Sequence, residues 1–415
     1  MSDFGRLREY LLEPGPGLWH RILDLLVKWP EESVQVAIDY TKQHFSDWPD
    51  ELRSYPRFHL QALLEKPKDW IPHQLSTRLD LIGDPWKRGE DGSAIEQEGA
   101  QALADSSHLS HLTILNIESG NIGCKGTAAL AGSPHFNQLK RLYLNFDGIA
   151  DEGAKALAQS QTLTQLEELQ LNNNDITAKG AEAIAYSNNL STLKILELRQ
   201  NNIGAKGGEH IASSPNMKDL RVLMLGNCGL GNKGILGLAR SEQLTALEVL
   251  GIQRNLFEKK AVKAFATSPV LKRLRELYVD LNELNDTDAK DLLSLQALPN
   301  LEKLNLARNG LTEKTLEHIA TSCTFPALRQ LDLSFNDIQN TGIEAIAHSD
   351  AFPVLDTLVI NNNPTDVKGA KTILVSQKLP KLAYLFLDSN RIPHNEHAEL
   401  YALAKERDIH IQYRC

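Results

Sequence analysis

The stretch that decides the fold is LEELQLNNNDITAKGAEAIAYSNNLST, residues 166–192, because it is one copy of a pattern that fills most of the chain. The pattern is 27 residues long, and its first leucine recurs at Leu112, Leu139, Leu166, Leu193, Leu220, Leu247, Leu274, Leu301, Leu328, Leu355 and Leu382. Eleven copies at one fixed period are typical of a solenoid, in which each unit packs on its neighbours. Such a chain is expected to offer an extended surface and not a catalytic pocket.

The first half of each copy has the pattern of a short strand. With the first leucine counted as position 0, positions 0, 3, 5 and 10 are apolar in nearly every copy, as in Leu166, Leu169 and Leu171. A spacing of two residues puts positions 3 and 5 on one face of a strand, toward a core. Position 8 is Asn in eight of the eleven copies, from Asn174 to Asn390. A buried amide must bond backbone groups that otherwise lack partners, so these residues predict a stacked asparagine ladder.

The second half of each copy has the pattern of a helix. In GAKALAQS (153–160) and GAEAIAYS (180–187), small and large apolar residues recur at helical spacing. Position 18 is large and apolar in all eleven copies, and position 19 is usually Ala, which lets the helix lie close to the strands. These units predict an α/β solenoid with parallel strands on its concave face and helices on its convex face.

Three copies carry a family resemblance. LEELQLNNNDI (166–176), LRQLDLSFNDI (328–338) and LEKLNLARNGL (301–311) match LxxLxLxxNxL, so the chain resembles the leucine-rich repeat proteins. The unit length and the helical second half are similar to the ribonuclease-inhibitor-like subclass. The resemblance covers residues 112–408 and implies a horseshoe that binds proteins on its concave face.

Position 8 departs from Asn in three copies, at Gly120, Asp147 and Cys228. Cysteine at this position is known in the family, which implies a structural role for Cys228. Glycine offers no side-chain partner, so the ladder is expected to be weakest near Gly120.

Two flanking segments are predicted to cap the array, because the end units of a solenoid would otherwise expose their core. Residues 75–111 contain a degenerate copy, in which Leu79 takes position 3, and an insertion. Residues 409–415 are predicted to form a final strand, with Ile409 aligned with Leu385 at position 3.

Residues 1–74 are predicted to form a separate helical domain, because their composition differs from that of the repeats. Helical patterns occur in FGRLREYLLE, LWHRILDLLVKW and PEESVQVAIDYTKQHF, all within residues 4–45. All five tryptophans precede the repeats, at Trp19, Trp29, Trp48, Trp70 and Trp86. They predict either the core of a small cap or a second docking surface.

Composition and charge exclude several classes of protein. A formal charge of −9 on 415 residues argues against the basic stripe that binds nucleic acid. No apolar run has the length of a signal peptide core or a membrane span, and the four cysteines form no CxxC pair. We expect a cytoplasmic protein with reduced thiols that is a monomer when unbound and contacts neither membrane nor nucleic acid.

Catalytic and metal-binding motifs are weak. The chain lacks GxxxxGK[ST], GxSxG and HExxH. His394 and His397 are three residues apart, as are His108 and His111, but no third ligand clusters with either pair in the sequence. We expect no enzyme activity, no cofactor and no metal.

Positions 2, 4, 6 and 7 of each copy are expected to face the concave side, where charges of both signs occur. The better candidates for partner binding there are the aromatic and apolar residues Phe335, Val359, Tyr384 and Phe386 in three adjacent copies, with Tyr143, Phe146 and Tyr278 elsewhere. Such residues dominate hot spots, so the first four predict a contiguous C-terminal site unless a cap or loop covers it. Asp332 and Asp388 would tune it for a partner that carries Lys or Arg.

Position 13 is Lys in seven of the eleven copies: Lys125, Lys179, Lys206, Lys233, Lys260, Lys314 and Lys368. These residues predict either a solvated feature of the repeat or a basic ridge for an acidic partner.

Two functions fit these observations. The first is a non-catalytic scaffold that binds a protein partner through the concave face. The second is a regulator of an enzyme, either an inhibitor like ribonuclease inhibitor or a GTPase activator like the leucine-rich activator of Ran. The sequence does not separate them.

Overall fold

The computed structural model of the protein describes residues 6–7, 10–11, 18, 21–22, 25–26, 34–44, 54–55, 78–81, 95–293 and 298–412. The chain divides into unit 1, Met1–Ile176 with Ser187–Leu196, and unit 2, Thr177–Tyr186 with Glu197–Cys415. The tryptophans and Cys415 lie outside the described residues.

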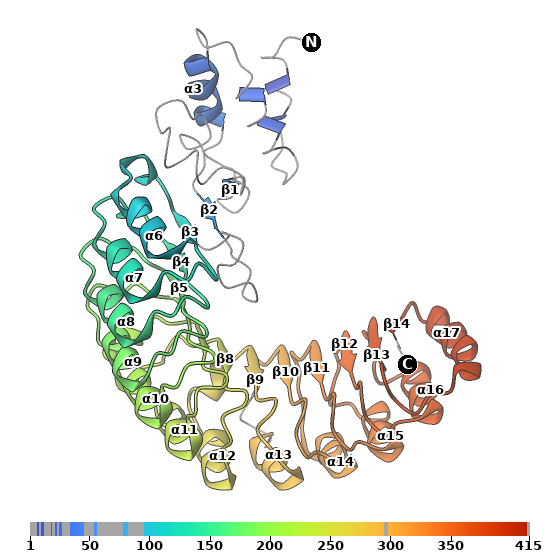
Figure 1. Ribbon diagram of the computed structural model, residues 1–415. Helices are drawn as coiled ribbons and strands as arrows, with labels where there is room; N and C mark the ends of the chain where they lie inside the picture. Colours follow the sequence, from blue (N-terminus) through green and yellow to red (C-terminus); the bar gives the residue numbers. More distant parts are fainter. Residues whose placement is uncertain are drawn as a thin grey trace. The chain divides into compact units, whose positions relative to one another are not determined.

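Unit 1 consists of parallel strands that alternate with helices (Figure 1). Its strands are β1 (Ser54–Tyr55), β2 (Arg78–Asp80), β3 (Ile114–Asn116), β4 (Arg141–Tyr143) and β5 (Glu168–Gln170), and each pairs with the next. Its helices are α3 (Val34–His44), α6 (Glu96–Asp105), α7 (Gly123–Gly132) and α8 (Ala150–Gln159), with the 3-10 turn η4 (Ser107–Leu109). Strand β6 (Ile195–Glu197) crosses the division between the units.

Unit 2 repeats the same alternation. Its strands are β7 (Val222–Met224), β8 (Val249–Gly251), β9 (Glu276–Tyr278), β10 (Lys303–Asn305), β11 (Gln330–Asp332), β12 (Thr357–Val359), β13 (Tyr384–Phe386) and β14 (His410–Gln412). Its helices are α9 (Ala178–Ala185), α10 (Gly204–Ser213), α11 (Gly231–Ala239), α12 (Lys259–Ala266), α13 (Asp286–Leu292), α14 (Glu313–Ser322), α15 (Asn340–Ala347), α16 (Val367–Val375) and α17 (His397–Glu406), with 3-10 turns η5 (Pro215–Met217), η6 (Leu271–Arg273) and η7 (His394–Glu396).

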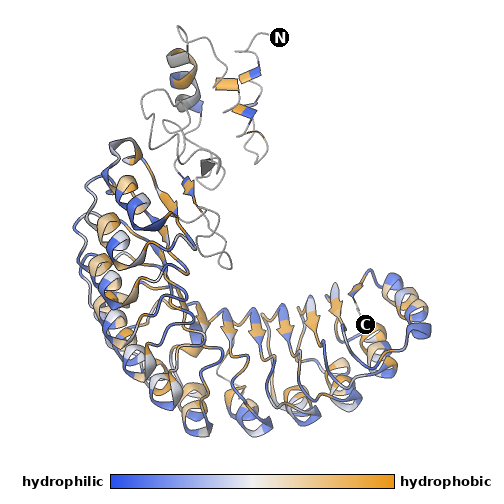
Figure 2. Cartoon of the chain, in the orientation of Figure 1, coloured by the Kyte–Doolittle hydropathy of each residue, from blue (hydrophilic) through white to orange (hydrophobic). Residues whose placement is uncertain are grey.

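The strands pair in parallel and in register, so equal positions of adjacent copies lie side by side. Leu304 pairs with Leu277 and Leu331, all at position 3, and all three are buried. Positions 2 and 4 flank that leucine and are partly exposed in most strands, for example in β9 and β11. Figure 2 shows hydrophobic residues on the strands and helices of each unit. The predicted α/β solenoid is confirmed.

The asparagine ladder is also present. Asn255 is 1% exposed, and its Oδ1 accepts hydrogen bonds from the backbone N–H groups of Cys228 and Leu230, both at 3.1 Å. Its Nδ2 donates to the carbonyl oxygen of Leu225 at 2.8 Å. Each asparagine therefore bonds the backbone of the preceding copy, as Asn282 does to Asn255 N–H at 2.7 Å.

The departures at position 8 keep part of this pattern. Cys228 is buried, and its Sγ lies 3.1 Å from the carbonyl oxygen of Leu198, where an asparagine amide would donate. Burial raises the pKa of the Cys228 thiol to about 12, so it stays protonated and acts as that donor. At Gly120 a Cβ atom would lie 2.6 Å from Ile117 Cγ2, so the close approach requires glycine.

A second ladder runs along the helix ends at position 21. Ser160 Oγ donates to the carbonyl oxygen of Ala131 at 2.6 Å, and Ser187 Oγ donates to that of Ala158 at 2.5 Å. Position 21 is serine in nine of the eleven copies, so the signal was available in the sequence. These bonds satisfy the last carbonyl groups of one helix from the next copy.

A third ladder consists of ion pairs at position 1, where the signs of the charges alternate in two runs, from Lys140 to Lys194 and from Arg221 to Asp356. Glu302 Oε1 lies 2.7 Å from Arg275 Nη2, and Glu248 lies 3.6 Å from Arg221. In unit 1, Lys194 and Glu167 are 2.9 Å apart. Because equal positions are neighbours in parallel strands, alternating charge favours the observed register.

The first and last repeats pair with flanking strands, and the register of β14 differs from the prediction. Leu79 pairs with Leu115, as expected. Leu385 pairs with Ile411 and not with Ile409, so the predicted alignment is wrong by two residues. The N–H of Ile409 instead donates a hydrogen bond to the carbonyl oxygen of Ala404 near the end of α17, so β14 begins only at His410.

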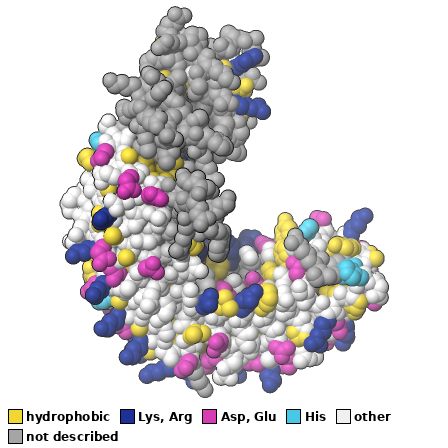
Figure 3. Space-filling view, viewed as in Figure 1, with side chains coloured by type: hydrophobic (Ala, Val, Ile, Leu, Met, Phe, Trp, Pro, Cys, Tyr) yellow, Lys and Arg dark blue, Asp and Glu magenta, His cyan; other side chains and the backbone are white. Residues whose placement is uncertain are grey.

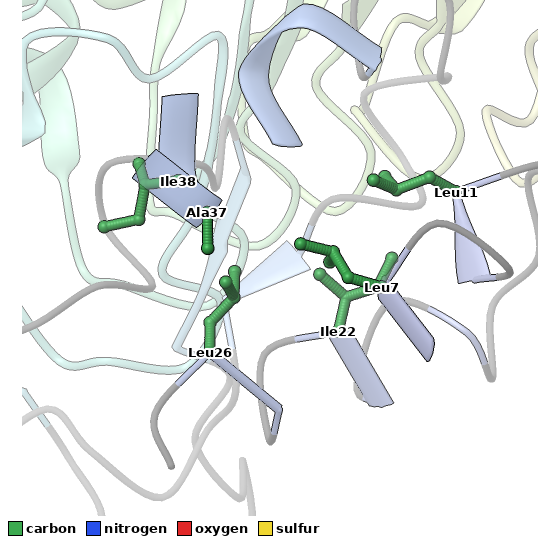
Figure 4. Close-up of a cluster of buried hydrophobic side chains, with 6 residues drawn as sticks. All are labelled: Leu7, Leu11, Ile22, Leu26, Ala37 and Ile38. Atoms are coloured by element: carbon green, nitrogen blue, oxygen red, sulfur yellow. The ribbon is translucent and has the colours of Figure 1, made fainter. Parts of the chain in front are cut away.

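The N-terminal part of unit 1 has an apolar cluster of its own. Leu7, Leu11, Ile22 and Leu26 pack with Ala37 and Ile38 of α3 (Figure 4). The bounds 1–74, 75–111, 112–408 and 409–415 stay predictions.

Candidate functional site

The strand face of unit 2, formed by positions 2 and 4 of its strands, is a grid of side chains set by the register. The row at position 4 runs through Tyr278, Asn305, Asp332, Val359, Phe386 and Gln412. The row at position 2 runs through Glu276, Lys303, Gln330, Thr357, Tyr384 and His410. Most of these side chains are polar, so apolar ones stand out.

Three predicted site residues come together at the end of this grid, and we name them the C-terminal patch: Val359, Tyr384 and Phe386. Val359 pairs with Phe386 across β12 and β13, and Tyr384 is two residues before Phe386 on the same face. Tyr384 is 48% exposed, while Val359 and Phe386 are partly exposed. Figure 3 shows hydrophobic side chains gathered over β12 and β13.

Phe335, the fourth residue predicted for this site, occupies a different place. It lies at position 7, beyond the end of β11, in a left-handed backbone conformation with φ of +55°. Its ring is 40% exposed and is covered on one side by the guanidinium of Arg308, 3.7 Å from the ring centroid. Phe335 is therefore already engaged within the chain and is not a member of the patch.

The other three predicted residues are separated from the patch in the sequence. Tyr143 and Phe146 belong to unit 1, where Phe146 is 39% exposed and burial raises the pKa of Tyr143 to about 12. Tyr278 donates its hydroxyl proton to Glu276 at 2.6 Å, and Glu276 also pairs with Lys303 at 2.9 Å. The structure therefore ties Tyr278 into a local polar network.

Two carboxylates border the C-terminal patch. Asp332 is the neighbour of Val359 on β11, and its Oδ1 accepts a hydrogen bond from Ser334 N–H at 2.9 Å. Asp388 follows Phe386 by two residues, and its Oδ2 accepts from Gln412 at 3.1 Å, while its buried Oδ1 has no hydrogen-bond partner. Neither carboxylate forms an ion pair with any lysine or arginine in the part of the chain that the structure describes.

A further acid on this face is affected by its neighbours. Burial raises the pKa of Asp280 above its ordinary value, and the negative charge of Asp332 adds a smaller increase. Arg199 and Arg308 act in the opposite direction. Asp280 and Asp332 are therefore close enough for their charges to interact.

The helix side carries the lysines of position 13, which are all exposed. Lys368 is paired with Glu344 at 2.8 Å, beside a groove of about 890 Å³ between α15 and α16. Acidic side chains are interspersed with basic ones over the helices (Figure 3). A continuous basic ridge does not emerge from the described residues.

Metal and membrane features are equally sparse. Among the residues described, no three His, Cys, Asp or Glu side chains are grouped so as to hold a metal ion. The rings of His394 and His397 are 4.8 Å apart, and the side chain of His108 is outside the described set. None of the described helices is both long enough and apolar enough to span a bilayer.

Comparison with known proteins identifies repeats in three segments of the chain. A family model described as Leucine Rich repeat matches residues 162–185, 189–212 and 326–347. No match was found among curated proteins. An internalin from Listeria monocytogenes is similar in structure, with a TM-score of 0.48 and 18% identity over 86% of this chain and 93% of its own. A leucine-rich repeat protein from Leptospira interrogans has a TM-score of 0.38 and 19% identity over 86% and 99%.

The in-register units form a solenoid of leucine-rich repeat type, and the family model identifies leucine-rich repeats in three of its segments. Assignment to the ribonuclease-inhibitor-like subclass stays a prediction. Proteins of this repeat family typically act in protein–protein interaction, which directs attention to the strand face.

Proposed function

We propose that the protein is a non-catalytic scaffold that binds a protein partner on the strand face, with the C-terminal patch at the centre of the contact. The observation that supports this most is the meeting of Val359, Tyr384 and Phe386 on adjacent strands of a mostly polar face. Adjacent exposed apolar side chains mark interaction sites, and aromatic residues dominate binding energies.

The patch contributes little to the core, which makes it separable from folding. Positions 2 and 4 point away from the buried leucines Leu358 and Leu385, which are both fully buried. Truncation of Tyr384 and Phe386 therefore removes contact area from the face without opening a cavity among the leucines.

The test uses the full-length wild type and two variants as bait, and identifies the proteins that each retains by cross-linking and mass spectrometry. Tyr384→Ala with Phe386→Ala should lose proteins that the wild type retains, with a loss of about 2 kcal/mol or more in binding free energy for a hot spot. The matched control is Tyr401→Ala, because Tyr401 is 51% exposed on α17 and not on the strand face. Equal capture by all three proteins would contradict the proposed site, and a collapsed melting temperature would show that the patch is core.

The same proposal includes an unbound monomer located in the cytoplasm, without enzyme activity or cofactor. A regulator of an enzyme, either an inhibitor or a GTPase activator, would use the same face. No feature of the described residues favours that second function, so the scaffold is preferred.

A further inference from the structure

We infer that the partner places an arginine side chain on the C-terminal patch, between Asp332 and Asp388. This inference rests on the proposed function, because it names the chemistry that the patch would recognise. Three observations carry it: the charge around the patch, the way the chain binds its own arginine, and the cost of burying the two carboxylates under any other partner.

The charge around the patch is negative, and no described lysine or arginine forms an ion pair with it. Asp332 borders Val359 on one side, and Asp388 follows Phe386 on the other. Elsewhere on this grid acids have partners, as Glu276 has in Lys303 at 2.9 Å. Among the described residues, the side-chain oxygens of Asp332 and Asp388 accept hydrogen bonds only from Ser334 N–H and from the Gln412 amide. A cation from the partner would supply the missing charge.

Just beyond the end of β11, the chain itself shows how an arginine binds an aromatic ring. The guanidinium of Arg308 lies 3.7 Å from the centroid of the Phe335 ring, stacked on an aromatic residue of the next copy. Tyr384 and Phe386 offer two rings within two residues of each other and have no such arginine of their own among the described residues. A planar guanidinium can stack on a ring and donate paired hydrogen bonds to a carboxylate at once, which an ammonium group cannot.

Other partner chemistries fit less well. An anionic segment would be repelled by both carboxylates. A purely apolar segment would cover Asp332 and Asp388 without giving them a donor, and burying an unpaired charge is costly. A partner arginine with an apolar neighbour fits both parts of the patch. The apolar side chain covers Val359, and the guanidinium donates hydrogen bonds to Asp332 and Asp388.

The experiment uses a displayed library of random 12-residue peptides, selected on the wild-type protein. Sequencing of the selected pool should show arginine together with an aromatic or aliphatic residue far above its frequency in the library. The same selection is run on Asp332→Asn with Asp388→Asn, which should lose the arginine enrichment. The control is Asp219→Asn with Asp350→Asn, which removes equal charge at two exposed positions away from the strand grid and should keep the enrichment.

A selected peptide is then measured with its arginine replaced by citrulline, which keeps the shape and removes the charge. We expect citrulline to weaken peptide binding to the wild type about tenfold or more. For the variant that lacks both carboxylates, the same replacement should weaken binding by less than about threefold. This coupling between two changes would not arise from a general loss of structure.

The outcomes separate the inference from the proposed function. Peptides that need Tyr384 and Phe386 but carry no arginine would overturn the arginine inference and leave the patch as the binding site. Arginine-rich peptides that bind equally well without Tyr384 and Phe386 would overturn both. Lysine serving as well as arginine would overturn the stacking argument, and a library without any enriched peptide would count against both proposals.

Discussion

At the scale of single residues, the asparagine at position 8 connects each copy to the one before it. Asn255→Ala removes acceptors for Cys228 N–H and Leu230 N–H and a donor to Leu225, all buried. We expect the free energy of unfolding to fall by about 1–3 kcal/mol, the cost of leaving buried polar groups unpaired. Urea unfolding of the variant checks this, and a loss of a few tenths of a kcal/mol would mean that water replaces the amide.

Asp147 is the one acid in the ladder, and it makes stability depend on pH. Its side chain is fully buried, and neither carboxyl oxygen has a partner at hydrogen-bonding geometry. Burial raises the pKa of Asp147 to about 8; the backbone of Gly120, Ile122 and Asn121 favours the charged form, and Glu118 opposes it. The carboxyl group is therefore protonated in the folded protein at neutral pH.

The sign of the effect follows from the two states. In the unfolded chain the pKa of an aspartate is about 3.9, so the stabilising effect of the bound proton is complete below that pH and is lost as the pH rises toward 8. Asp147→Asn removes this pH-dependent loss of stability, because the asparagine amide is neutral at every pH in this range. We expect the variant to exceed the wild type in melting temperature by more at pH 8 than at pH 4, and a difference independent of pH would contradict the assignment.

At the scale of elements, the alternating charges at position 1 support the register of the strands. Arg275→Glu would place an acid between Glu248 and Glu302, so that three acids would lie side by side. The variant should unfold at lower urea concentration than the wild type in low salt, and the gap should close in 1 M NaCl because exposed charges are screened. The control is Arg254→Glu, at an exposed arginine without an ion pair among the described residues, and it should show a smaller salt dependence.

The elements were predictable from the sequence wherever a period decides them. Strands at every 27 residues and the role of Asn255 follow from spacing and from the need to satisfy buried amides. The register of β14 did not follow, because Ile409 and Ile411 are two residues apart and would face the same side in either alignment. The end of α17, closed by the bond from Ile409 N–H to Ala404, decides between them.

At the scale of the whole molecule, the sequence predicted which strand positions face outward, and the structure shows which of the candidate residues are neighbours. Positions 2 and 4 were expected to face outward, and Tyr384 is exposed there. Phe335 was grouped with the patch because it is aromatic and nearby in the array. Its engagement with Arg308 depends on the left-handed turn after β11, which no spacing rule reveals. Equally, the protonation of Asp147 depends on complete burial, which composition does not report.

The repeat also makes a prediction about length. Because each copy packs only on its neighbours, removal of one whole copy leaves every remaining position matched to an equivalent one. Deletion of residues 247–273 would bring Asn282 to the place that Asn255 occupies, opposite Cys228. We expect this variant to keep cooperative unfolding and the helical circular dichroism per residue of the wild type. Arg221 would then meet Arg275, so the measurement belongs at moderate salt.

The control deletes residues 247–260, about half a copy, which places strand positions opposite helix positions. That variant should lose cooperative unfolding, because the buried leucines and the asparagine ladder no longer align. The whole-copy deletion should also bind a selected arginine peptide within about twofold of the wild type, since β11–β13 and their side chains are untouched. If both deletions unfold the chain alike, stability depends on contacts beyond adjacent copies. If only peptide binding is lost, the partner site extends from the C-terminal patch toward β8.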